Sequence, residues 1–161
     1  MPGRPAARMG DLTAHGSPLA GSPGSMNVLI GSMPAWRGTS PAGVASLVAA
    51  VAQAATDIAT ASAAATAAAA TPAGPAAQAN LVKTAVDAVA KLAAMMASMP
   101  GDMHACPIVK VVIPDGTGIV INGSATVLIN GMPAARMGDT IQEATSVSTI
   151  AIGAPNVLIG G

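Results

Sequence analysis

The stretch PAARMGD occupies residues 5–11 and recurs, letter for letter, at residues 133–139. Each copy is followed by an apolar cluster that ends in glycine, VLIG at 28–31 and again at 157–160. A third cluster, VLING, occupies residues 127–131. Because repetition of a short segment indicates that one supersecondary unit has been reused, the sequence predicts a fold assembled from similar small units.

The segments around these repeats have the composition of short strands. β-Branched runs at 27–30, 119–122, 126–129 and 147–152 are bounded by Gly, Pro, Asn and Ser. We expect 119–122 and 126–130 to form a hairpin, because only three residues, including Gly123, separate them. Asn130-Gly131 predicts a tight turn leading to Pro133, which places the second PAAR at an edge or a turn.

Residues 39–100 differ from both flanks because Ala, Val, Ser and Thr dominate them. Alanine is the best helix former, and apolar residues recur at intervals of three and four, so we predict helices over 41–70 and 76–98. Asp57 in the first helix and Lys83, Asp87 and Lys91 in the second favour a soluble antiparallel αα-hairpin over a stable membrane span. A membrane-inserting delivery helper that uses this Ala-rich hairpin is the alternative.

The composition limits both the core and the partners. The 161 residues include one Trp and no Phe or Tyr, which predicts a thin core that a metal or a partner would supplement. The formal net charge is zero, which argues against nucleic-acid binding, and the single Cys excludes an internal disulfide. Residues 1–15 contain no apolar signal segment, so we expect synthesis in the cytoplasm.

Two histidines and the cysteine are the candidate metal ligands. His104 and Cys106 are two positions apart, so both side chains point to the same face if the chain is extended there. His15 follows the first PAARMGD, and imidazole and thiolate are preferred donors for zinc. Glu143 is a lone acid in the sequence, and no residue pattern supplies a general base, so we do not expect an enzyme. A small zinc-dependent enzyme is the competing hypothesis.

Two further features suggest structural roles. Arg8 with Asp11, and Arg136 with Asp139, have equal spacing and predict ion pairs that stabilise turns. The sequence PAWR at 34–37 replaces PAAR, and we expect Trp36 to pack under the helices or to anchor an interface.

Together, these motifs resemble those of PAAR-repeat proteins, which form the sharpened spike tip of type VI secretion and related contractile injection systems. The resemblance covers residues 4–37 and 102–161. It implies a mainly β, small pseudo-threefold conical tip formed by 1–38 and 101–161, with 39–100 as an inserted helical hairpin. It also implies a structural Zn²⁺ near the apex, held by three His and one Cys.

The resemblance assigns His15, His104 and Cys106 as metal ligands. Asp115 stands where a third His is usual and is the first choice for the fourth ligand, with water, Asp102 and Asp11 as alternatives.

The implied function is a non-enzymatic tip that caps and sharpens the trimeric β-helical spike and aids membrane puncture. The expected partner is a VgrG-like trimer that binds one copy of this chain. A cargo, effector or chaperone would use the hairpin, and the assembled machine would deliver the protein out of the cell.

Overall fold

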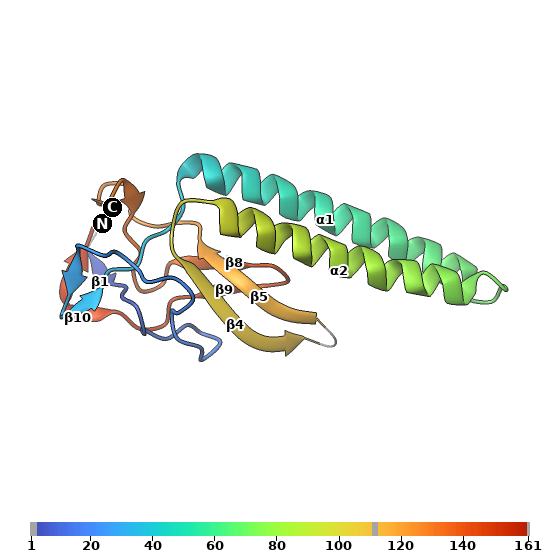
Figure 1. Ribbon diagram of the computed structural model, residues 1–161, viewed down its shortest axis with the longest axis horizontal. Coiled ribbons are helices and arrows are strands. Elements are labelled where there is room, and N and C mark those ends of the chain that lie inside the picture. Colours follow the sequence, from blue (N-terminus) through green and yellow to red (C-terminus); the bar gives the residue numbers. More distant parts are fainter. Residues whose placement is uncertain (1–2, 111–112, 161) are drawn as a thin grey trace.

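The computed structural model describes residues 3–110 and 113–160, with the side chains of 109, 110 and 113–115 outside the description. A β-rich body carries both chain ends, and two long helices run along one side of it (Figure 1). The predicted combination of a β-rich body with two helices is confirmed.

A curled four-stranded antiparallel sheet forms the centre of the body, with strands in the order β4-β5-β8-β9. The strands are β4 (Met103–Lys110), β5 (Ile113–Val120), β8 (Thr140–Glu143) and β9 (Val147–Thr149). The expected hairpin between 119–122 and 126–130 is wrong, because Val120 pairs with Ile141 of β8. Residues 128–129 pair instead with 132–133 across the Asn130-Gly131 turn, whose φ angles are 55° and 77°. A two-residue turn with positive φ at both positions closes the shorter hairpin directly.

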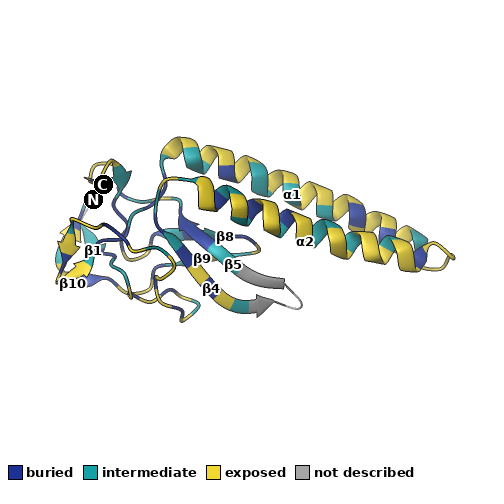
Figure 2. Cartoon of the chain, in the orientation of Figure 1, coloured by how far each residue is buried: buried dark blue, intermediate teal, exposed yellow. Residues whose placement is uncertain are grey.

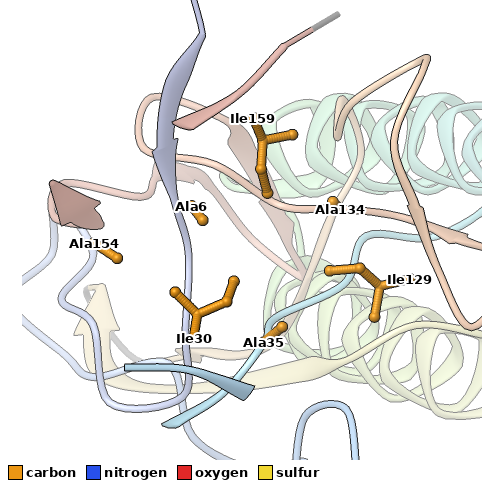
Figure 3. Close-up of a cluster of buried hydrophobic side chains, with 7 residues drawn as sticks. All are labelled: Ala6, Ile30, Ala35, Ile129, Ala134, Ala154 and Ile159. Atoms are coloured by element: carbon orange, nitrogen blue, oxygen red, sulfur yellow. The ribbon is translucent and has the colours of Figure 1, made fainter. Parts of the chain in front are cut away.

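Three short strand pairs lie outside this sheet. They are β1 (Arg4–Ala6) with β10 (Ala154–Ile159), β2 (Leu29–Ile30) with β3 (Met33–Pro34), and β6 (Leu128–Ile129) with β7 (Met132–Pro133). The Leu-Ile part of each VLI cluster therefore lies in a strand of one pair. The isoleucines Ile30, Ile129 and Ile159 point into one cluster with small alanines, and each is only 7% exposed (Figure 3).

Backbone hydrogen bonds close a ring through the third residues of PAAR, PAWR and PAAR. The Trp36 N–H donates to the Ala7 carbonyl (2.9 Å), Ala7 to Ala135 (2.9 Å), and Ala135 to Trp36 (3.0 Å). The Trp36 side chain is fully buried among Leu19, Val120 and other residues of the β body. Both expectations for Trp36 are therefore wrong: the side chain neither packs under the helices nor anchors a surface. Its backbone belongs to the hydrogen-bonded ring, and its side chain lies inside the β body.

The two helices, α1 (Pro41–Ala68) and α2 (Gly74–Ser98), pack against each other and are called the helix pair below (Figure 1). Ser40 caps α1 by accepting a hydrogen bond from the Gly43 N–H (3.2 Å). Leu47, Leu92 and Met96 cover Ile119 and Ala144 of the β body in one apolar cluster.

Much of the helix-pair surface is exposed (Figure 2). Among the described residues, α1 is the one helix long and apolar enough to cross a membrane, judged by length and composition alone. Its most apolar window has a mean hydropathy of 1.5, and 6% of that window is buried.

Candidate metal centre

Four side chains with metal-binding atoms come together where β4 and β8 face the loop after the first PAARMGD. His104 and Cys106 lie on β4 and are both buried, whereas Ala105 between them is exposed. This is the alternation that the two-residue spacing predicted. His15 approaches from the loop, and Glu143 ends β8 with a fully buried side chain.

The cross-strand register brings His104 and Glu143 onto the same row of the sheet. His104 pairs with Gly118 of β5, and Gly118 pairs in turn with Glu143. A Cβ atom at Gly118 would lie 2.8 Å from the Glu143 Cγ and 2.7 Å from the Ile141 Cγ2. The absence of a side chain at Gly118 therefore makes the room that Glu143 occupies.

Short distances separate the candidate ligand atoms. His15 Nδ1 lies 3.2 Å from Glu143 Oε2 and 3.7 Å from Cys106 Sγ, and these three groups lie within 4.8 Å of one another. His104 Nε2 lies 3.7 Å from Glu143 Oε1. That carboxylate oxygen is buried and has no hydrogen-bond partner in the described part of the chain. A buried carboxylate oxygen without a donor is costly, and a cation would satisfy it.

Neighbouring groups contact the two candidate ligands on β4. His104 Nδ1–H donates to the Pro18 carbonyl (3.0 Å), which leaves Nε2 as the lone-pair donor facing the cluster. Burial lowers the pKa of His104, which keeps the imidazole neutral, and burial raises the pKa of the Cys106 thiol. The Ser17 hydroxyl lies 3.3 Å from His104 Nε2 and 4.0 Å from Cys106 Sγ.

The donor set fits zinc, which accepts imidazole nitrogen, thiolate sulfur and carboxylate oxygen in a tetrahedral arrangement. Asp115, expected as the fourth ligand, lies outside the described side chains. The alternatives Asp11 and Asp102 are bound by the guanidinium groups of Arg8 and Arg37. Glu143 is thus the described carboxylate that faces the three expected ligands.

A repeated spacing in the sequence would have identified Glu143. Glu143 follows Asp139 by four positions, as His15 follows Asp11 and Cys106 follows Asp102. The three residues that lie within 4.8 Å of one another therefore occupy the same position after three different aspartates.

Comparison with protein families gives two matches to the PAAR motif, over residues 89–147 and 112–161. No curated protein and no solved structure matched the chain. PAAR proteins are structural spike-tip components of contractile injection systems and not an enzyme family. The matches cover the second PAARMGD, and the first copy repeats it letter for letter. The chain therefore belongs to the PAAR-repeat proteins of the type VI secretion and contractile injection kind.

Proposed function

We propose that this protein caps the blunt end of a trimeric, VgrG-like spike as a single copy. The observation that carries the proposal is the set of three outward leucines on the three short strand pairs. Leu29, Leu128 and Leu158 are 59%, 59% and 62% exposed, while the neighbouring isoleucines are all 7% exposed. Large apolar side chains exposed at matching places in the three strand pairs suit contacts with a threefold partner.

A threefold partner requires three similar contacts from one chain. The three strand pairs and the hydrogen-bonded ring of Ala7, Trp36 and Ala135 support a pseudo-threefold cone. In this arrangement the leucines would rest on the three sides of the spike and cover its unpaired strand edges. The metal centre would lie away from this base and hold the narrow end of the cone together.

For that centre we propose a structural Zn²⁺ bound by His15, His104 and Cys106, with Glu143 as the fourth ligand in place of Asp115. Glu143 is favoured because its Oε1 atom is buried and has no hydrogen-bond donor among the described residues. One thiolate and one carboxylate would also balance the two positive charges of the ion. In a domain with few large apolar residues, binding of a metal contributes directly to folding.

Elemental analysis of purified protein tests the metal centre. We expect one zinc per chain in the unaltered protein and in Asp115→Asn, and loss of zinc in Glu143→Gln. If Asp115→Asn loses zinc and Glu143→Gln keeps it, Asp115 is the fourth ligand. Unaltered protein without zinc would refute the proposed metal centre.

Mixing with the spike trimer tests the cap. Native mass spectrometry should show one chain per trimer, and replacing Leu29, Leu128 and Leu158 together with Ser should abolish the complex. Val48→Ser is the matched control, because Val48 is 54% exposed but lies on α1. A different ratio, or binding that survives the triple change, would contradict the proposal.

The helix pair is the proposed docking arm for a cargo, effector or chaperone. The protein would be made in the cytoplasm, assembled on the machine and delivered out of the cell, where the tip aids membrane puncture. We do not expect catalysis, and absence of hydrolytic turnover by zinc-loaded protein would exclude the small zinc enzyme.

A second candidate function, membrane insertion by the helix pair, is favoured by the length and apolar composition of α1. Partitioning of the full chain into liposomes tests it. If the protein stays in the aqueous phase at every lipid concentration, the membrane role is excluded.

A further inference from the structure

Two turns with the same hydrogen bonds form the last four residues of the two PAARMGD strings. In the first, the Arg8 N–H donates to Asp11 Oδ2 (2.8 Å), Arg8 Nη2 to Asp11 Oδ1 (2.9 Å), and the Asp11 N–H to the Arg8 carbonyl (3.1 Å). Arg136 and Asp139 make the same three bonds at 2.8, 3.1 and 3.0 Å. We call this arrangement the Arg–Asp turn.

Arg37 and Asp102 form a third Arg–Asp turn, although 65 positions separate them. The Arg37 N–H donates to Asp102 Oδ2 (2.8 Å), and Arg37 Nη2 to Asp102 Oδ1 (2.8 Å). The Asp102 N–H donates to the Arg37 carbonyl (3.0 Å), the bond that spans only three residues in the other two turns. The whole helix pair lies between these two residues.

The residues next to the two ends also match the intact copies. The Gly38 N–H donates to the Pro133 carbonyl (2.8 Å), as Met9 does to Pro34 (2.9 Å) and Met137 does to Pro5 (2.8 Å). Gly38 therefore occupies the place of the methionine that follows arginine.

Gly101 takes the place of the glycine before aspartate. Its φ of 132° is positive, as are those of Gly10 (88°) and Gly138 (81°). A Cβ atom on Gly101 would lie 3.0 Å from the Gly38 carbonyl oxygen, so Gly38 and Gly101 lie side by side. Residues 39–100 are thus inserted between two residues that are adjacent in the other copies.

We propose that the third Arg–Asp turn is a carrier site, meaning a position at which a separately folded segment, the passenger, is inserted into the β-rich body. Arg37 and Asp102 hold the two ends of the passenger together. The site suits a passenger whose ends lie together, because the turn holds them at the separation of neighbouring residues. The passenger also needs an apolar face near its ends, as Leu47 and Met96 provide over Ile119. The present occupant is the helix pair, and the cone itself does not depend on it.

The first test compares two aspartates in the full chain. Asp102→Asn should lower the melting temperature of zinc-loaded protein by several degrees, within a factor of two of the effect of Asp11→Asn. Asp11 is the matched control, because the Arg8–Asp11 side chains are 24% and 6% exposed and the Arg37–Asp102 side chains 20% and 2%. An unchanged melting temperature for Asp102→Asn would show that the Arg37–Asp102 pair does not hold the two ends together, and would overturn the proposal.

The second test removes residues 39–100, which joins Arg37-Gly38 directly to Gly101-Asp102. We expect a folded protein with the same zinc content per chain and no helical signal in circular dichroism. Because removal uncovers Ile119 and Ile121, the same deletion is also made with both changed to Thr. If neither version folds and binds zinc while Asp102→Asn matches its control, the helix pair is part of the core and the carrier site is refuted.

Discussion

The three buried isoleucines allow a quantitative test of whether the base is threefold. Ile30, Ile129 and Ile159 occupy matching places in the three strand pairs, and each is 7% exposed. Ile→Val removes one methylene group, which contributes about 0.8 kcal/mol when buried, and the small cavity left behind brings the cost to about 1 kcal/mol. For a chain of this size, such a loss lowers the melting temperature by about 2–4 °C.

Differential scanning calorimetry of the three single variants, with zinc saturating throughout, measures these shifts. If the proposed threefold base is correct, we expect the three shifts to agree with one another, because each isoleucine lies opposite an equivalent residue in its strand pair. Leu29→Met is the control: it conserves volume at a position that is 59% exposed and should leave the melting temperature unchanged. The usual cost of Ile→Val ranges from about 0.5 to 1.5 kcal/mol. If one isoleucine variant lowers the melting temperature more than about three times as far as another, the difference exceeds that range and the threefold reasoning fails.

Three other predictions concern the metal centre and the helix pair. Gly118→Ala should destabilise the protein by about 1–3 kcal/mol through overpacking. It should also weaken zinc binding, because the added Cβ would lie 2.8 Å from Glu143 Cγ. Thermal unfolding measures the first effect and competition with a chelator the second, and an unchanged zinc affinity would contradict the crowding argument. Burial raises the pKa of the Cys106 thiol, so the thiol is protonated at neutral pH and zinc binding should release its proton. The affinity for zinc should therefore rise with pH. Calorimetry in buffers of different ionisation enthalpy measures the proton release, which should be absent in Cys106→Ser. Lys83→Ala should leave the melting temperature unchanged, because the Lys83–Asp87 pair is largely exposed, and a clear drop would show that the pair matters more than its exposure suggests.

Local features were predictable where neighbouring residues determine the structure. The helices over 41–68 and 74–98 follow from alanine-rich sequence with glycine and proline only at their ends. The Asn130-Gly131 turn formed as expected, because these residues tolerate positive φ. Likewise, the two-residue period of a strand places His104 and Cys106 on one buried face.

Pairings between distant segments were not predictable from the same arguments. The expected hairpin does not form because Val120 pairs with Ile141 of β8. No local sequence pattern identifies the distant strand with which a given strand will pair. The position of Glu143 depends on β5 lying between β4 and β8, and on the missing side chain at Gly118. The predicted position of Trp36 was wrong for a similar reason, because its hydrogen-bonded ring with Ala7 and Ala135 joins all three repeats.

The sequence by itself determined the repeated units, the helix pair and most of the candidate metal ligands, because each depends on propensity or spacing within a few residues. Only the tertiary structure decided that Arg37 and Asp102 complete a third Arg–Asp turn across the helix pair. The physical reason is that the entropic cost of closing a loop rises only slowly with its length. A turn can therefore remain intact around a long insertion, while the adjacency that would reveal it in the sequence is lost.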